Sequence, residues 1–391
     1  MDGPIPPCSP TPEFAARLPT ILRTRVPSQA FRRSLQQWRA GFLGNLAKPD
    51  LRFVIWMATR RCNLRCTYCV LPHEESPGAD LPTDEVKRIF SEIAADFDAS
   101  KIMVGITGGE CTLRPDLVDI VGHMVKLGFR TVACDSNGVN YGRDPALLDR
   151  LVDAGMRCPT ISCDGTGDGQ RAIRRDASAG ALTWKAIEYA MKRYPTLGLT
   201  TICAASPHNL AEVPAVFQRF EDLGVTFARI SAIFPIGRAA GDPTQVLSPT
   251  DLRRVMTWVA EQRTLFQAGM RDLEIEFIDD GWCGVAWEGG LLRGNFLYCR
   301  AGVTVLGIEH DGRIVACPVI HESFNVQGDA RTERVSDVFR DRFRPFRDRA
   351  WLKQGDCAQC REWNACLGGS LHNRTADGHL TRCTEPLLRG G

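Results

Sequence analysis

The sequence predicts an α/β protein with a curved, open partial barrel of six strands, followed by a small cysteine-rich unit. From Leu51 to about Asp279, short β-branched runs alternate with amphipathic stretches, which is the pattern of βα units around a parallel sheet. After Trp282 this alternation stops, and cysteines recur at close spacings. Six strands are too few to close an eight-stranded barrel, so we expect an open one.

The individual elements follow from the same alternation. We expect strands over 53–58, 101–107, 129–135, 158–164, 199–205 and 226–233, and helices over 83–97, 114–127, 145–155, 180–193, 211–223 and 250–268. Active sites in such sheets lie at the carboxyl ends of the strands. The loops that follow the strands are therefore where functional residues should be sought.

Length and composition bound the class of protein. At 391 residues the chain has room for a large α/β domain and an appended module, which we place at 51–280 and 281–391, after an N-terminal extension over 1–50. The net charge of +2 gives no reason to expect nucleic acid. No apolar run is long enough for a membrane span and no signal segment opens the chain, so we expect a cytoplasmic protein. Its 16 cysteines, spread through a large α/β pattern, favour metal or catalytic use over disulfides.

The first 50 residues are the least informative. The prolines between Pro4 and Pro12 disfavour regular structure. Between Arg17 and Lys48 the chain has seven basic residues and no acidic one. This segment is read either as a solvated surface stretch or as a basic arm for an acidic partner.

Three cysteines directly follow the first expected strand. Cys62, Cys66 and Cys69 are spaced C-x3-C-x2-C within the stretch Thr59–Cys69. Iron–sulfur clusters are held by cysteine thiolates, normally four of them, so three close thiolates would leave one iron open. The alternatives are a zinc site or three unrelated thiols, but structural zinc sites usually use paired ligands and close with four.

This motif, with Tyr68 at its aromatic position, resembles the signature of the radical S-adenosylmethionine (SAM) superfamily. The resemblance implies a [4Fe–4S] cluster whose open iron binds the amino and carboxylate groups of SAM. It also implies reductive cleavage of SAM to methionine and a 5′-deoxyadenosyl radical, which abstracts a substrate hydrogen. An external reductant such as flavodoxin or ferredoxin would supply the electron.

Later strand ends resemble the superfamily's other motifs. Gly108, Gly109 and Glu110 correspond to the Gly-Gly-Glu turn that holds the SAM amine, although Cys111 replaces the usual proline. The resemblance implies further SAM contacts from strand ends three and four and from a following arginine, and it places the turn 233–239 near adenine. These expected contacts, beside Tyr68, are Ser136, Asn137, Ser162, Asp164 and Arg174.

The C-terminal cysteines resemble a SPASM domain, which carries auxiliary iron–sulfur clusters. Asp311-Gly312 indicates a hairpin between 303–308 and 313–316, bracketed by two cysteines. Ser370 stands where the family has a further cysteine. Either one complete cluster forms on the last four cysteines, with a second cluster only if Cys283 or Ser370 adds a ligand, or a single cluster uses the first four. Taken alone, the spacing also fits zinc. The expected ligands are Cys299, Cys317, Cys357, Cys360, Cys366 and Cys383.

Three functions follow from these readings. Enzymes with this extension mostly modify ribosomally made peptides by crosslinking, epimerisation or oxidation, and this is our leading expectation. The alternative is dehydrogenation or epimerisation of an aminoglycoside-like sugar or other small metabolite. A non-catalytic iron–sulfur or zinc protein is the third. Candidate donors or bases on the substrate side are Cys111, Tyr298 and His372, whereas strand alternation points Cys163 into the core.

Overall fold

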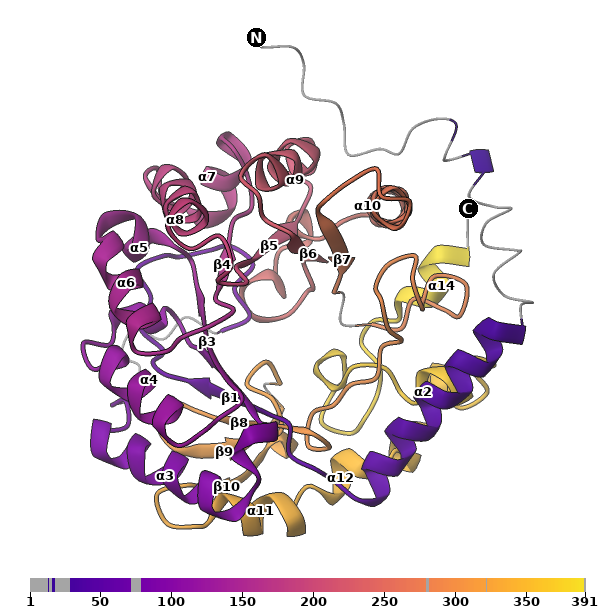
Figure 1. Ribbon diagram of the computed structural model, residues 1–391. Coiled ribbons are helices and arrows are strands. Elements are labelled where there is room, and N and C mark those ends of the chain that lie inside the picture. Colours follow the sequence, from indigo (N-terminus) through magenta and orange to yellow (C-terminus); the bar gives the residue numbers. More distant parts are fainter. Residues whose placement is uncertain are drawn as a thin grey trace.

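The structure is a computed structural model that describes residues 13, 16–17, 29–71, 79–278, 281–320 and 322–389. Within these residues ten strands form one sheet in the order β10-β9-β8-β1-β2-β3-β4-β5-β6-β7. Figure 1 looks into the curve of this sheet, with the helices of the first two thirds of the chain outside it. The prolines between Pro4 and Pro12 lie outside the described residues.

All six expected strands are present and pair in parallel. A seventh strand was not expected, because its four residues, Glu-Ile-Glu-Phe, are too short and too charged to stand out. It pairs with β6 and extends the open barrel. The strands are β1 (Phe53–Met57), β2 (Met103–Thr107), β3 (Thr131–Ser136), β4 (Thr160–Ser162), β5 (Thr200–Ala205), β6 (Phe227–Ala232) and β7 (Glu274–Phe277).

The six expected helices are also present, as α3 (Thr83–Asp96), α4 (Leu117–Lys126), α6 (Pro145–Asp153), α8 (Ala179–Arg193), α9 (Val213–Asp222) and α10 (Pro249–Gln267). Two short ones were missed, α5 (Val139–Arg143) and α7 (Asp168–Arg174). Both directly follow strand-end motifs and are too brief for a helical period to be read. None of the described helices is long and apolar enough to cross a bilayer.

Strand residues alternate between two environments. One set is fully buried, because the helices cover that face of the sheet (Figure 1). It includes Cys134, Ile161, Cys203, Ala228 and Ile230. Successive side chains on a strand point to opposite faces, so the residues between them face the inside of the curve. Cys163 is fully buried, as expected.

The predicted hairpin is confirmed as β8 (Val305–Ile308) and β9 (Arg313–Val315), with Gly312 at φ +96°. The sequence did not indicate that β8 would pair in parallel with β1, which attaches the C-terminal region to the edge of the barrel sheet. β10 (Val326–Asp329) pairs with β9. Short helices follow, α11 (Val335–Asp341), α12 (Arg344–Arg347), α13 (Trp363–Cys366) and α14 (Thr384–Arg389). The boundary expected at residue 280 lies outside the described residues and stays a prediction.

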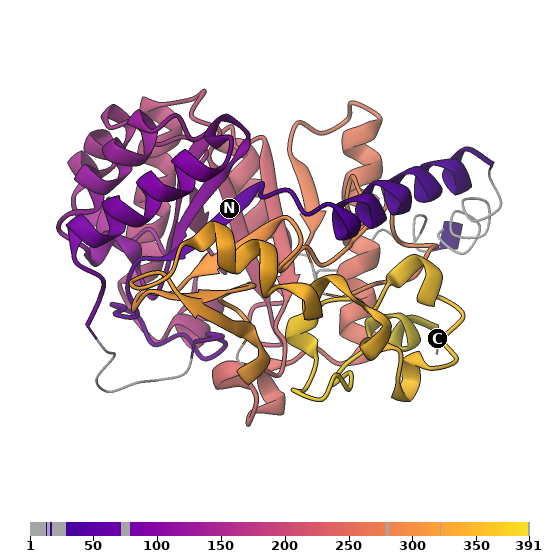
Figure 2. The same cartoon turned by 90° about the horizontal axis from the view of Figure 1, so that it is seen from below.

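Part of the N-terminal region is a packed helix, and its expected role as a basic arm for an acidic partner stays a prediction. Gln29–Ala47 forms a helix, α2, that lies along the C-terminal region (Figure 2). Trp38 donates its indole N–H to the carbonyl of Phe296 at 2.8 Å, and the ring of Phe42 stacks on Tyr298 at 4.7 Å. Arg32 and Arg33 remain exposed. The basic residues noted in the sequence therefore include some on the solvent side of this helix, whereas Trp38 and Phe42 lie on its packed side.

Candidate active site

The loop after β1 is fixed to the turn after β2. Gly109 N–H donates to the carbonyl of Thr59 at 2.7 Å, and Glu110 N–H donates to that of Arg61 at 2.8 Å. A Cβ at Gly109 would lie 2.3 Å from the Arg61 carbonyl oxygen, and one at Gly108, where φ is +150°, would lie 2.4 Å from that of Thr59. Both glycines are therefore required by the close approach of two backbones.

Cys62, Cys66 and Cys69 converge in this loop. The carbonyl of Cys66 accepts from Arg238 at 3.0 Å, and the Cys62 sulfur accepts the N–H of Leu64 at 3.4 Å. Burial raises the pKa of Cys66 to about 11, with Arg174 lowering it and the other two thiols raising it further. The three sulfurs are thus close enough to sense one another's charge, as ligands of one cluster would be.

Three thiolates on one short loop suit an iron–sulfur cubane, which takes one thiolate on each of several irons. The hydrogen bond from Leu64 to the Cys62 sulfur also suits a cluster, because such bonds tune iron–sulfur sites.

Glu110 is buried and receives four hydrogen bonds. Its Oε1 accepts from the N–H and hydroxyl of Thr112, at 3.2 and 2.5 Å, and from the Ser136 hydroxyl at 2.8 Å. Its Oε2 accepts only the N–H of Asn137, at 2.8 Å. A carboxylate offers about four lone-pair sites, two on each oxygen. Oε2 therefore keeps one acceptor position for an ammonium group.

Ser136 and Asn137 were expected to touch SAM, and the structure gives them local partners. The Ser136 hydroxyl donates to Glu110, and the Asn137 amide donates to Asn63 Oδ1 at 2.8 Å. Both residues therefore hold Glu110 and the cysteine loop in place. Ser162 is half-buried on the inside of β4. Contact of any of these three with SAM stays a prediction.

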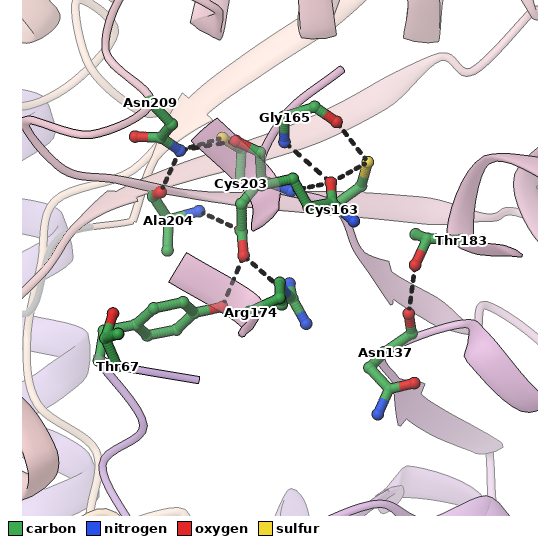
Figure 3. Close-up of polar contacts among 12 residues, drawn as sticks. Thr67, Asn137, Cys163, Gly165, Arg174, Thr183, Cys203, Ala204 and Asn209 are labelled. Carbon is green, nitrogen blue, oxygen red and sulfur yellow. Dashed lines mark hydrogen bonds and ion pairs between the residues drawn. The ribbon is translucent and has the colours of Figure 1, made fainter. Parts of the chain in front are cut away.

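Asp164 organises the other side of the site. Its Oδ2 accepts from Arg174 Nε at 2.5 Å and from the Tyr68 hydroxyl at 2.8 Å, and its Oδ1 accepts the N–H of Ala204 at 2.9 Å. Figure 3 shows Arg174 and Ala204 meeting at this carboxylate. Both Asp164 and Arg174 are buried, so the pair is held away from solvent.

Arg174 has a hydrogen-bond donor that is not used within the described part of the chain. Its Nη2 is buried and has no hydrogen-bond partner within the described part of the chain. A guanidinium stays charged at all ordinary pH values and binds carboxylates well. Because Arg174 also acts electrostatically on Cys66, a carboxylate on Nη2 would lie next to the cysteine loop. This orphaned donor fits the carboxylate of SAM.

Two amide side chains that support Asp164 were missed from the sequence. Asn209 donates to the carbonyl of Asp164 at 2.6 Å, and Gln170 Oε1 accepts the N–H of Gly165 at 3.0 Å (Figure 3 shows Asn209 and Gly165). Both fix the strand end that presents Asp164. Lone amide side chains in loops carry no spacing pattern, so nothing in the sequence could have singled them out.

A cavity of about 150 Å³ adjoins Tyr68. It is lined mainly by apolar side chains, including Phe234 and Ile236 of the expected adenine turn, and by His372 from the C-terminal region. The His372 ring meets Phe234 edge-on at 5.8 Å. Of the three catalytic candidates, His372 is therefore the one that borders this cavity.

The other two candidates lie elsewhere. Cys111 is fully buried, and its thiol donates to the carbonyl of Asp135 at 3.4 Å on the helix-covered side of the sheet. Tyr298 is stacked under α2 in an apolar cluster with Trp282 and Val303. Neither residue lines the cavity beside Tyr68, and a catalytic role for either one stays a prediction.

Four C-terminal cysteines surround a second cavity, of about 540 Å³, together with Ser370. Burial raises the pKa of Cys366 to about 12, and Cys383 and Cys357 raise it further. This favours the allocation in which one complete set holds a cluster. The set is Cys357, Cys360, Cys366 and Cys383.

The remaining cysteines are placed apart from that cavity lining. Cys299 and Cys317 are half-buried beside the hairpin, where the Cys299 carbonyl accepts from Arg349 at 2.7 Å. Cys283 is buried, and its sulfur lies 3.4 Å from Arg293, which pairs with Glu288. A second auxiliary cluster on Cys299 and Cys317 stays a prediction.

Comparison with known proteins agrees with this geometry. The radical SAM superfamily model matches residues 56–220, and the iron–sulfur cluster-binding SPASM model matches 299–361. The chain is 26% identical over 338 residues to an AdoMet-dependent heme synthase of Methanosarcina barkeri, covering 81% of this chain and 90% of that protein. It is 28% identical over 330 residues to the mycofactocin maturase MftC of Mycobacterium ulcerans, covering 81% and 82%.

A solved structure supports the fold. SuiB of Streptococcus suis, crystallised with its precursor peptide SuiA, superposes with a TM-score of 0.68 at 16% identity, covering 88% of this chain and 79% of that one. The first match contains Cys62, Cys66 and Cys69, the second contains Cys299, Cys317, Cys357 and Cys360, and such domains carry [4Fe–4S] clusters. The chain is therefore a radical SAM superfamily enzyme with a C-terminal SPASM domain.

Proposed function

We propose that this enzyme reductively cleaves SAM and uses the radical to modify a ribosomally made peptide in the cytoplasm. One observation carries the first part. The cysteine loop, the free lone pair of Glu110 Oε2 and the orphaned Nη2 of Arg174 all lie at one edge of the sheet. A cluster with an open iron, once bound by these cysteines, supplies the electron that breaks a carbon–sulfur bond of SAM.

The chain's own residues orient the methionine end of SAM. Arg174 Nη2 takes the carboxylate, and Asp164 holds the guanidinium so that this nitrogen stays available. Glu110 Oε2 takes the ammonium group, and Ser136 and Asn137 fix that carboxylate. The apolar cavity beside Tyr68 and Phe234 suits a planar base and excludes water from it.

The C-terminal cysteines support a role in electron transfer. Four thiolates complete a cluster, so the set of Cys357, Cys360, Cys366 and Cys383 leaves no position for substrate. Such a cluster can accept the electron that remains on the substrate after hydrogen abstraction. Flavodoxin or ferredoxin would provide the first electron to the other cluster.

The substrate class rests on the relatives. A PqqA peptide cyclase of Rhodopseudomonas palustris, 27% identical over 330 residues, acts on a peptide by name, and the mycofactocin maturase is by name a maturation enzyme. The AdoMet-dependent heme synthases, at 24–26% identity, favour a second candidate in which the substrate is a small metabolite. Peptide modification is proposed first because the fold is also shared with SuiB.

Size fractions of a host extract separate the two candidates. The anaerobic, reduced enzyme is mixed with SAM and with either the peptide fraction or the metabolite fraction, and 5′-deoxyadenosine and substrate masses are measured. We expect the peptide fraction to stimulate 5′-deoxyadenosine formation and one peptide to change mass. Stimulation by the metabolite fraction alone would contradict peptide modification in favour of the second candidate. The Cys62/Cys66/Cys69→Ala variant is the control and should show neither effect.

Gly109→Ala tests the backbone contact on which the site is built. The added Cβ would meet two carbonyl oxygens of the cysteine loop at 2.3 and 2.6 Å and must displace that loop. A displacement near 1 Å costs about 10²-fold in rate, and we expect that loss in 5′-deoxyadenosine formation. Gly122→Ala in α4 is the control, because its nearest neighbouring atom is 3.9 Å away. Equal activity of the two variants would contradict the placement of the loop.

A further inference from the structure

Three polar residues face the inside of the barrel and are not used by the proposed SAM site. Asp135 on β3, Thr160 on β4 and Arg229 on β6 alternate with fully buried neighbours that pack under the helices. Asp135 and Thr160 are direct register partners on neighbouring strands. Because successive side chains on a strand point to opposite faces, the three side chains lie on the face of the sheet away from the helices.

These residues form one connected group. Arg229 Nη2 donates to the Thr160 hydroxyl at 3.0 Å. The Thr160 hydroxyl in turn hydrogen-bonds the Asp135 carboxylate, which also senses the charge of Arg229. Thr160 thus connects a cation on β6 to an anion on β3, across the width of β5.

This group contains a hydrogen-bond donor that is not used within the described ranges. Arg229 Nε is buried and has no partner, and no carboxylate within the described ranges forms an ion pair with this guanidinium. Glu276, its register partner on β7, instead accepts from Gly294 N–H at 2.6 Å and lies 3.7 Å from Arg263. Buried polar donors are rarely left unpaired, so Arg229 is available for an anion.

Asp135 is exposed, although the residues on either side of it on β3 are buried. Surrounding protein raises the pKa of its carboxyl by burial, with Arg229 and Thr160 opposing the shift. The carboxylate is therefore accessible to a small molecule while it stays next to the Arg229 guanidinium.

The position is suited to a substrate. Asp135 directly precedes Ser136 and Asn137, which hold Glu110, and Thr160 lies on the strand that ends at Asp164. The group therefore lies one layer below the residues assigned to SAM. A substrate held there would present a carbon to the edge where the radical is generated.

We propose that Arg229 and Asp135 form the substrate-orienting site of the barrel: Arg229 binds a carboxylate of the substrate, and Asp135 accepts a hydrogen bond from a hydroxyl or ammonium group of the same molecule. This deepens the proposed function and rests on it. The carboxylate can be the C-terminus of a peptide or an acidic side chain, and both present the same two oxygens to the guanidinium.

Small probes test the assignment without radical chemistry. Binding to the anaerobic, SAM-loaded, unreduced holoenzyme is measured by calorimetry for N-acetylglycylglycine as the free acid and as the amide. A second pair, N-acetylglutamate α-amide and N-acetylglutamine amide, represents a side-chain carboxylate. We expect the acid of at least one pair to bind at least about tenfold more tightly than its amide, as charge-assisted hydrogen bonds are stronger, and the pair that responds identifies the source.

Arg229→Gln is expected to abolish this difference between acid and amide. Asp135→Asn is expected to keep it, but to remove the preference for N-acetylserine over N-acetylalanine. Arg193→Gln, on an exposed part of α8, is the control and should behave as wild type. Equal binding of acid and amide, absence of binding, or a difference that survives in Arg229→Gln would each overturn the proposal.

Two further measurements keep the outcomes separate. The iron content and melting temperature of each variant should match wild type, since none of the substituted side chains is a cysteine or bonds to the cysteine loops. Wild type and the Arg193→Gln control should form 5′-deoxyadenosine slowly in the absence of substrate. If the wild type forms no 5′-deoxyadenosine, the proposed function is wrong. The probe-binding results still test the substrate-orienting site, because they do not require SAM cleavage.

Discussion

Replacing Cys62, Cys66 and Cys69 together with alanine is expected to reduce 5′-deoxyadenosine formation to the background level. Without these thiolates no cluster forms after β1, and no electron reaches SAM. The variant should lose about four iron atoms per chain, the content of one [4Fe–4S] cluster. The C-terminal set should still bind its own iron, since it lies in a separate cavity. Iron and sulfide analysis of anaerobically purified protein measures the loss, and chromatography measures 5′-deoxyadenosine.

The matched control is Cys158→Ala, which removes an exposed cysteine. It should retain the iron content and the activity of the wild type. If the triple variant still formed 5′-deoxyadenosine, the assignment of the first cluster would be wrong. If it lost all iron, the two cysteine sets would not be independent.

Arg174→Gln is expected to weaken SAM binding by at least about 10²-fold. The substitution removes the orphaned Nη2 and also leaves Asp164 as a buried, unpaired carboxylate. Truncating one partner of a buried, hydrogen-bonded charge pair at a binding site typically costs about 2–5 kcal/mol of affinity, and about 1.4 kcal/mol corresponds to each tenfold change. The middle of that range corresponds to more than about 10²-fold. Equilibrium dialysis with labelled SAM on the iron-loaded protein measures the affinity directly.

Arg171→Gln provides the comparison, since Arg171 lies on the same helix but is mostly exposed and pairs with exposed Asp168. Exposed pairs contribute only about 0–1 kcal/mol, so SAM affinity should remain close to that of the wild type. A larger effect from Arg171 than from Arg174 would contradict the choice between these two arginines.

The barrel could be predicted from the sequence because its pattern is strong. Six strands and six helices each show a regular alternation over enough residues to be read. β7, α5 and α7 were missed because four to seven residues carry no clear period. The pairing of β8 with β1 was missed for a different reason, since contacts between residues about 250 positions apart leave no local signal.

The site residues that belong to motifs with a fixed spacing could be predicted from the sequence. The residues that only the fold brings together could not. The cysteine spacing and the Gly-Gly-Glu turn identify the loops, and the structure brings these loops together. Burial of Cys111 and Tyr298 could not be read from residue type, because both occur in sites and in cores. Asp135 and Arg229 lie on different strands, and only the curvature of the sheet brings them to one space.

The central claim is that the first cluster has one iron without a protein ligand. Mössbauer spectra of ⁵⁷Fe-reconstituted protein, recorded with and without SAM, test it most directly. One iron of the cluster after β1 should change its isomer shift when SAM is added, while the irons of the C-terminal cluster should not change. Spectra that are identical with and without SAM, or protein that contains zinc in place of iron, would contradict the account.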